Sequence, residues 1–383
     1  MNPEDFNGQA GTVTQALKGI HYTFTPNKMP SEIKLSSKTL KKLEDATHAL
    51  GNLNGVGHSL VNPHLLIRPY LKKEAVWSSK IEGTRTSLSD VFLYEAKAGA
   101  PVEEEKDIDL VEVINYINAT EHGLKEIKTK NIDLNLILEI HKILLSGVRG
   151  ASKDPGKVRI DQNWIGPYGS SILEATFVPP APEKLSELLD DLFSFLNDKN
   201  DLPDLLKIGL AHYQFEATHP FRDGNGRIGR LLIILYLCKK QKLGLPLLYI
   251  SGYFEKYRSQ YYDLLLDVSK KGDYESWLNF FLDAIITQSN DATQRILKLE
   301  EYSKIAKSKL MQKRNMQALK VLEHLFINPF INIPFAEKLL KKRYPTAKRA
   351  IITLVNEGIL QDAKIKDGKT KIFVATEINT ILS

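Results

Sequence analysis

The sequence predicts a mainly α-helical protein with one β-hairpin and a C-terminal winged helix-turn-helix domain. Apolar residues recur at three- and four-residue spacing through most of residues 64–286, which is the period of amphipathic helices. Residues 158–182 interrupt this pattern with glycines and prolines between short β-prone pieces, which is typical of an irregular hairpin. Residues 313–383 change pattern again, with three short amphipathic helices before two strand-like pieces.

The composition is that of a folded, multidomain protein. A chain of 383 residues is longer than one hydrophobic core usually covers, so we expect two or three domains. Residues 1–11 have no apolar core and so do not resemble a secretory signal, and the longest apolar run, Leu231–Cys238, is too short to span a membrane. The single cysteine excludes an intramolecular disulfide and a cysteine-based zinc site. We therefore expect a cytoplasmic protein without a membrane segment.

The N-terminal part is expected to form a helical region over residues 1–105. Residues 1–60 mix glycine and proline with short helical patterns. A continuous helical pattern starts near Pro63 and is ended by Gly83. Acidic residues 103–109 mark the expected boundary of this region.

Three further regions are expected beyond this boundary: a helical core over residues 106–290, a polar helical linker over 291–312 and the winged helix-turn-helix over 313–383. In the core, Asp133 is the expected N-cap of an amphipathic helix. In the last domain, the basic segment 345–357 is the expected recognition helix, and a lysine-rich turn separates the two final strands.

Positive charge is concentrated at the C-terminal end. Residues 313–383 contain 13 Lys and Arg against 6 Asp and Glu, whereas the whole chain carries a net charge of +6. This excess suggests an acidic partner such as duplex DNA, contacted at its phosphates. A solvated lysine-rich surface and a protein-docking or dimer module remain alternatives. The scarcity of aromatic residues among these basic ones argues against single-stranded nucleic acid.

The densest chemical signal is the segment His219–Arg230, which reads His-Pro-Phe-Arg-Asp-Gly-Asn-Gly-Arg-Ile-Gly-Arg. A helical pattern precedes it and a strongly apolar one follows, so the turn Gly224-Asn225-Gly226 is expected at a helix N-terminus. Small residues let backbone N–H groups converge there, and the helix dipole adds positive potential. That combination binds phosphate.

The side chains around this turn suit nucleotide chemistry. Arg227 and Arg230 can bind further phosphate oxygens, and Asp223 can hold a Mg²⁺ ion that bridges two phosphates. His219 is the nearby side chain that titrates close to neutral pH, which makes it the expected general base. No P-loop is present. The alternative is a glycine-rich helix start with an incidental histidine and surface ion pairs.

This segment closely resembles the signature of the Fic family, His-Pro-Phe-x-Asp/Glu-Gly-Asn-Gly-Arg-x-x-Arg, and matches every specified position. The resemblance runs from about Pro63 to Ile285 and implies a Fic-type helical core with a β-hairpin flap. It also implies a nucleotidyltransferase that moves AMP from ATP to a Ser, Thr or Tyr hydroxyl of target proteins and of itself, releasing pyrophosphate. By this resemblance His219 deprotonates the hydroxyl, Asp223 holds Mg²⁺, and the glycine turn binds the α- and β-phosphates. Doc-type kinases have a lysine at the position of Gly226, which argues against phosphorylation.

Two more segments resemble the family. Residues 159–180 resemble the flap that pairs with the backbone of a target protein, although by themselves they predict only a structural hairpin. Residues 78–83, Ser-Ser-Lys-Ile-Glu-Gly, match the family's inhibitory helix pattern Ser/Thr-x-x-x-Glu-Gly/Asn. The spacing puts Ser78 and Glu82 on one helix face, which by itself is typical of a solvated face. By resemblance, Glu82 pairs with Arg230 and blocks the place of the ATP γ-phosphate.

Other functions remain open at this stage. A nucleotide-sensing transcription regulator is one alternative, although a pure sensor has no need of the base His219. A Fic transferase that uses another nucleotide donor is a second. In some relatives the glutamate equivalent to Glu82 also helps to remove AMP, so de-AMPylation is a third. Relatives often pair through helices near the core, which suggests a homodimer.

Overall fold

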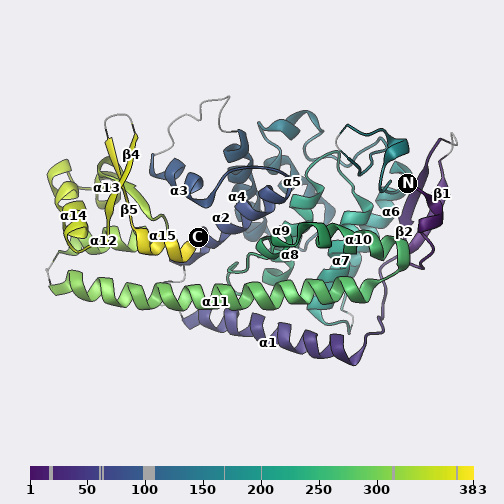
Figure 1. The fold of residues 1–383 in the computed structure, drawn as a ribbon, viewed down its shortest axis with the longest axis horizontal. Coiled ribbons are helices and arrows are strands. Elements are labelled where there is room, and N and C mark those ends of the chain that lie inside the picture. Colours follow the sequence, from purple (N-terminus) through teal and green to yellow (C-terminus); the bar gives the residue numbers. More distant parts are fainter. Residues whose placement is uncertain are drawn as a thin grey trace.

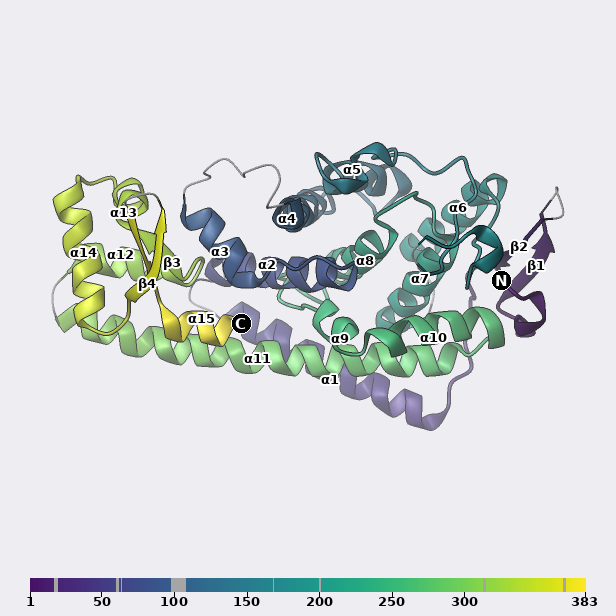
Figure 2. The ribbon, with the colours of Figure 1, turned by 45° about the horizontal axis from the view of Figure 1, so that its top comes forward.

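The computed structural model describes residues 1–16, 20–59, 62, 64–97, 108–167, 169–199, 201–312, 315–367 and 370–383. Figures 1 and 2 show an elongated molecule, with a helical body between a small β-hairpin at one end and a compact α/β module at the other. The long helix α11 (Tyr274–Gln312) runs beneath most of this length. No helix within the described ranges is both long and apolar enough to cross a membrane.

The N-terminal residues form a hairpin and one long helix, in place of the short helical patterns expected for residues 1–60. Strands β1 (Gly11–Gln15) and β2 (Tyr22–Pro26) pair antiparallel. Helix α1 (Ser37–Ser59) then packs lengthwise against α11, as Figure 1 shows. The expectation of a purely helical N-terminal region was therefore wrong, because alternation over only five residues is a weak strand signal.

The helical body is a bundle around two central helices, α7 and α8. Its helices are α2 (His64–Ile81), α3 (Leu88–Ala96), α4 (Ile108–Glu126), α5 (Leu134–Leu144), α6 (Leu185–Asn197), α7 (Asp204–Thr218), α8 (Asn225–Lys239), α9 (Ser251–Lys256) and α10 (Arg258–Lys271). The expected N-cap Asp133 is confirmed, since its Oδ1 accepts a hydrogen bond from the N–H of Leu136 at 2.9 Å. Nearly every residue of α7 and α8 is buried, so the turn between them is held firmly from both sides.

The expected linker over residues 291–312 is not a separate element. It is the second half of α11, which continues without a break from the core. The sequence changes there from apolar to polar, but it contains no glycine or proline that would end a helix. The change in polarity therefore marks where α11 leaves the hydrophobic core. It does not mark the end of the helix.

The C-terminal module, residues 315–383, contains the three helices and the hairpin that the sequence predicts, and adds one strand and one helix. Its elements are α12 (Met316–Leu325), β3 (Phe330–Asn332), α13 (Ile333–Leu340), α14 (Tyr344–Asn356), β4 (Gln361–Asp367), β5 (Thr370–Val374) and α15 (Thr376–Leu382). Strand β5 lies between β3 and β4 in an antiparallel sheet. The expected basic helix coincides with α14 to within a residue at each end.

The C-terminal module is attached to the first helices of the body. The buried side chains of Asn328, two residues before β3, and Asn332, its last residue, donate hydrogen bonds to two main-chain carbonyls of α3 at 2.8 and 3.0 Å. Lys73 of α2 is also buried, and its Nζ donates to the carbonyl of Leu382 at 3.0 Å. Helix α2, which carries Ser78, therefore contacts both the body and the module.

The expected hairpin at residues 159–180 is a loop closed by a single bridge in its described residues. Ile165 and Phe177 pair antiparallel, with N–H to carbonyl oxygen distances of 2.8 and 3.0 Å. Pro167 cannot donate to a ladder, so pairing does not extend toward the tip. The Phe177 ring packs on Phe24 of β2 with centroids 5.7 Å apart, so the N-terminal hairpin supports this loop from behind.

Several expectations concern residues outside the described part of the chain. These are the helical start at Pro63, the domain boundary between residues 105 and 106, the domain start at Lys313, and Gly368 and Lys369 of the lysine-rich turn.

Candidate active site

The turn between α7 and α8 shapes the signature segment. Helix α7 ends before His219, which takes a left-handed conformation with φ of 46°, because a residue that precedes proline is disfavoured in a right-handed helix. Gly224 is also left-handed, with φ of 80°, and α8 starts directly after it. The buried Asn225 side chain closes the turn through two hydrogen bonds of 2.8 Å to the backbone N–H and carbonyl of Phe221. The predicted turn at a helix N-terminus is therefore present, and the Asn225 side chain is committed to holding it.

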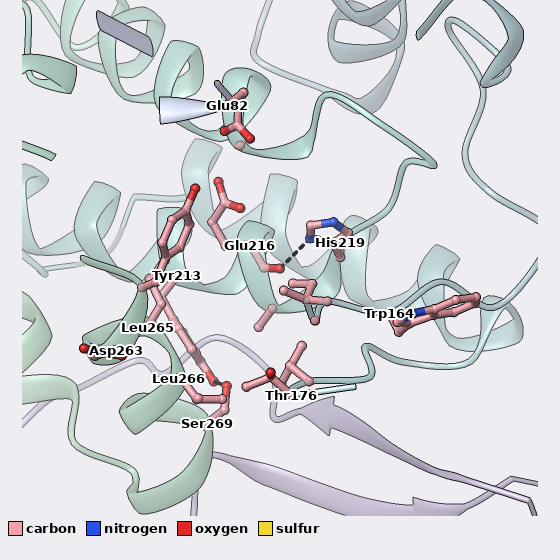
Figure 3. Close-up of a pocket in the computed structure, with 16 residues that line it drawn as sticks. Glu82, Trp164, Thr176, Tyr213, Glu216, His219, Asp263, Leu265, Leu266 and Ser269 are labelled. Carbon is pink, nitrogen blue, oxygen red and sulfur yellow. Dashed lines mark hydrogen bonds between the residues drawn. The ribbon is translucent and has the colours of Figure 1, made fainter. Parts of the chain in front are cut away.

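His219 is held in one tautomer. Its Nδ1 lies 3.2 Å from the main-chain carbonyl oxygen of Glu216, as Figure 3 shows. A carbonyl only accepts, so Nδ1 carries the proton and Nε2 keeps its lone pair. Burial lowers the pKa of His219 to about 4, so the ring is neutral at physiological pH. A neutral imidazole with an unprotonated Nε2 beside a cavity is a competent general base.

The guanidinium of Arg230 is fully buried and is bound by α2. Its Nη2 donates to Glu82 Oε1 at 2.6 Å and to the carbonyl of Ser78 at 3.0 Å, while its Nε donates to Ser78 Oγ at 2.9 Å. The Glu82–Arg230 contact that the family resemblance implies is therefore present. Burial acts against ionisation of Glu82, but the Arg230 charge holds the pKa of Glu82 below its usual value. Gly83, with φ of 101°, turns the chain away after this contact.

The Glu82 carboxylate covers the first turn of α8. A side-chain carbon at Gly226 would lie 2.5 Å from Glu82 Oε1 and 2.8 Å from Nη1 of Arg230, so any larger residue would displace the charged ends of these two side chains. The N-terminus of a helix is where a phosphate group binds most readily. Glu82 thus lies on the surface to which the sequence assigns the nucleotide phosphates.

Arg227, the other arginine of the segment, is bound on a different side. Its Nη1 lies 3.4 Å from a carboxylate oxygen of Glu112, and its Nη2 lies 3.3 Å from Oδ1 of Asp223. Arg149 binds the same Glu112 at 2.8 Å. Arg227 is therefore already ion-paired with two carboxylates. To bind a phosphate, its guanidinium would have to give up one or both of these ion pairs.

Asp223 is a suitable but solitary metal ligand. Its side chain is 38% exposed at the edge of the turn. Among the described residues no group of three or more His, Cys, Asp and Glu side chains could hold a metal ion. One exposed carboxylate nevertheless fits Mg²⁺, which usually takes its remaining ligands from substrate phosphates and water.

A cavity of about 570 Å³ lies beside His219, Glu82 and Gly226, whereas Asp223, Arg227 and Arg230 do not belong to its lining. Glu82, His219 and Gly226 line one part of it, while the loop residue Phe177 and Leu265 of α10 belong to its apolar part. The size and the mixed lining are typical of sites for small molecules such as nucleotides.

His141 of α5 contacts the signature segment, which the sequence does not predict. Its Nδ1 accepts the N–H of Gly156 at 2.9 Å, so its Nε2 donates to the carbonyl of Asp223 at 3.0 Å. Its ring stacks on Phe221 with centroids 3.9 Å apart. Arg159 was likewise not singled out, although its buried Nε donates to the carbonyl of His219 at 2.9 Å. No periodicity or motif in the sequence marks these contacts.

Comparison with known proteins places these features in one family. A family model described as Fic/DOC family matches residues 131–237, and one described as Fic/DOC family N-terminal matches residues 40–125, together about half of the chain. The chain is 30% identical to the protein adenylyltransferase Fic of Aedes aegypti over 261 residues, and 30% identical to that of Drosophila mojavensis over 287 residues. These alignments cover 65% and 70% of this chain but 46% and 49% of the relatives. The chain therefore spans about half the length of the curated relatives it matches.

Solved structures agree in fold. A Fic family protein from Desulfovibrio desulfuricans superposes with a TM-score of 0.56 at 16% identity, covering 90% of this chain and 98% of that one. Fic-1 from C. elegans gives a TM-score of 0.51 at 22% identity, covering 70% and 74%. The Fic-type helical core expected from the sequence is thus confirmed.

We expect Gly226→Ala to reduce stability by about 1–3 kcal/mol, because the added carbon forces the charged ends of Glu82 and Arg230 apart. Chemical unfolding of the full chain measures this. Gly51→Ala in α1 is the matched control, since a side-chain carbon at Gly51 would have no neighbouring atom of the described part of the chain within 4 Å. This change is expected to stabilise the protein by about 0.5–1 kcal/mol. In a Glu82→Gly background the Gly226→Ala change should cost less, and an equal cost in both backgrounds would contradict this explanation.

We expect the His219 ring to titrate with a midpoint near 4 in the folded protein, measured by NMR of ¹⁵N-labelled histidine. An unfolded histidine titrates at about 6.5, so the unfolded state binds the extra proton first, and stability falls as the pH drops through this window. His219→Gln, which cannot ionise, should therefore lose less stability between about pH 7 and pH 5 than the wild type. A folded-state midpoint near 6.5 would contradict the expected burial effect.

Proposed function

Because the chain belongs to the Fic/DOC family, we propose that it is a protein adenylyltransferase that moves AMP from ATP to a Ser, Thr or Tyr hydroxyl of target proteins, and of itself. One observation carries this proposal: a neutral His219 with an unprotonated Nε2 shares a cavity with the first turn of α8. The names of the curated relatives support it. We also propose a cytoplasmic location, which the single cysteine favours.

The residues perform this transfer as follows. Nε2 of His219 accepts the proton of the target hydroxyl, and the hydroxyl oxygen forms a bond to the α-phosphorus. The bond from the α-phosphorus to the oxygen that bridges to the β-phosphate breaks, and pyrophosphate leaves with that electron pair. Backbone N–H groups of the 224–226 turn and the α8 dipole stabilise the phosphate charge. A Mg²⁺ ion held by Asp223 supplies further neutralisation of the phosphates when it is bound.

We further propose that α2 keeps the enzyme inhibited. The Nε and Nη2 donors of Arg230 are engaged by Ser78 and Glu82, and the Glu82 carboxylate lies over Gly226. A γ-phosphate would have to displace Glu82 to reach either surface. Withdrawal of Glu82 frees the guanidinium to bind phosphate oxygens with its forked donors.

The test is to incubate wild type, Glu82→Gly and His219→Ala with Mg²⁺ and ATP labelled at the α-phosphate, and to measure label bound to protein. We expect weak label in the wild type, at least about tenfold more in Glu82→Gly, and a loss of about 10²–10⁴ in His219→Ala, as is usual for removal of a general base. Lys80→Ala is the matched control, because Lys80 lies in the same turn of α2. Its ion pair is with Glu255, so its removal leaves the Glu82–Arg230 pair in place. Other nucleoside triphosphates and a CDP-alcohol, labelled likewise, test the donor.

The outcomes separate the two parts of the proposal. Absence of label from every donor would contradict the transferase function. Equal label in the wild type and Glu82→Gly would contradict the inhibitory role alone. Label in His219→Ala at the level of the wild type would contradict the assignment of the base.

As a second function, we propose that the C-terminal module is a winged helix-turn-helix that binds duplex DNA. The supporting observation is a group of exposed basic residues around the start of α14, namely Lys341, Lys342, Arg343, Lys348 and Arg349. Recognition helices contact DNA through their N-terminal residues, and Lys and Arg contacts to phosphate make the affinity depend on salt.

We expect the double change Lys348→Glu and Arg349→Glu to weaken binding to a duplex of about 30 base pairs at least tenfold and to lower the salt slope by roughly 2. Fluorescence anisotropy of the full chain at several salt concentrations measures both. The control is Lys298→Glu with Lys309→Glu, which makes the same charge change at exposed positions of α11. An equal loss in both double variants would point to net charge instead of this surface, and no binding at low salt would contradict the proposal.

A further inference from the structure

Two glycines on one face of α8 each leave room for a carboxylate. A side-chain carbon at Gly226 would lie 2.5 Å from Glu82 Oε1, and one at Gly229 would collide with Glu216 Oε1. Residues three apart in a helix are neighbours on its surface, so the two carboxylates rest on successive turns of the same face. Figure 3 shows the carboxylates of Glu82 and Glu216 directed toward one another, and both residues line the same cavity.

Within the described ranges, one oxygen of the Glu216 carboxylate lacks the hydrogen-bond partner that a buried carboxylate oxygen normally has. Its side chain is only 13% exposed, and its Oε1 accepts no hydrogen bond from the described residues. Nε2 of His212 lies 3.9 Å away, but that nitrogen is hydrogen-bonded to the Tyr261 hydroxyl at 2.7 Å. Burying an unpartnered carboxylate costs stability, so its presence in a cavity indicates a role outside folding.

The same carboxylate lies close to the cation that a triphosphate needs. The charge of Arg230 acts on Glu216, and burial outweighs it and raises the pKa of Glu216 to about 7. Arg230 is bound to Glu82, and within the described part of the chain its Nη1 has no hydrogen-bond partner. Glu82 is ion-paired with this guanidinium and Glu216 is not, so incoming phosphates meet a second carboxyl group whose ionised form carries an uncompensated charge.

We propose that Glu216 is a specificity-determining residue for the nucleotide donor, whose carboxylate opposes the entry of triphosphate charge independently of Glu82. This inference rests on the proposed function, since it takes the cavity as the donor site. Glu216 forms a second restraint that stays in place when α2 withdraws. Its side chain can be changed cleanly, because His219 is bound to the backbone carbonyl of Glu216 and not to its carboxylate.

The experiment compares full-length protein with and without Glu216→Gln, each in the wild-type and the Glu82→Gly background. Calorimetry measures the affinity for α,β-methylene ATP, which cannot release pyrophosphate, and for adenosine, which carries no phosphate charge. We expect Glu216→Gln to bind the triphosphate analogue about tenfold more tightly in both backgrounds, and adenosine within about twofold of its parent. Asp263→Asn is the matched control, since it removes an exposed acid from the same cavity and should change the affinity less than about threefold.

Each other outcome overturns the inference. Equal tightening for adenosine would mean that the cavity changed shape. A gain that disappears in the Glu82→Gly background would mean that Glu216 acts through Glu82. No gain in affinity for the triphosphate analogue would mean that the Glu216 charge does not affect donor binding. Failure of every variant to bind the analogue would contradict the inference together with the proposed function, whereas transfer of label by Glu82→Gly without an effect of Glu216→Gln would contradict the inference alone.

Discussion

The buried guanidinium of Arg230 determines how the centre of this molecule is arranged. A charge without partners in that position would cost several kcal/mol, so the fold must bring acceptors to it. Ser78 and Glu82 provide them from one face of α2, which fixes how α2 is rotated against α8. The same contact lays the Glu82 carboxylate over Gly226. One ion pair therefore both stabilises the fold and covers the first turn of α8.

Arg230 is not the only group that holds α2 in place. Toward the C-terminal module, Lys73 donates to the carbonyl of Leu382, and Lys72 pairs at 2.6 Å with Glu95 of α3, the helix whose carbonyls accept from β3. On the side of α9, Glu74 accepts the N–H of Ser251 at 3.1 Å. A movement of α2 large enough to remove Glu82 from α8 would disturb these neighbours as well. The position of Glu82 is thus tied by packing to residues about 300 positions further along the chain.

Much of this site could be predicted because most of its residues are close together in the sequence. His219 to Arg230 lie in one turn and its flanking helices, and Ser78 and Glu82 share a helix face through their spacing alone. The contacts of His141, Arg159 and Glu216 could not be predicted, because they depend on which distant helices meet. The errors have similar causes. The N-terminal hairpin is too short to show a clear period, and the polarity of residues 291–312, which are helical as expected, does not show that they continue α11 without a break.

The construction of α8 sets a limit on how inhibition and donor binding can be separated. A phosphate at this helix start needs close access to the backbone at Gly226, and so does the Glu82 carboxylate that lies there now. The phosphate and the Glu82 carboxylate both need the absence of a side chain at position 226. A larger residue there would therefore hinder both of them, and would not separate one from the other. Discrimination must therefore come from groups that face the turn. Glu82 approaches from α2 and can leave with it, whereas Glu216 and His219 belong to α7 and its end and remain. Under the proposed function, α2 therefore brings the group that competes with the donor, and α7 with its end brings the groups that the reaction meets.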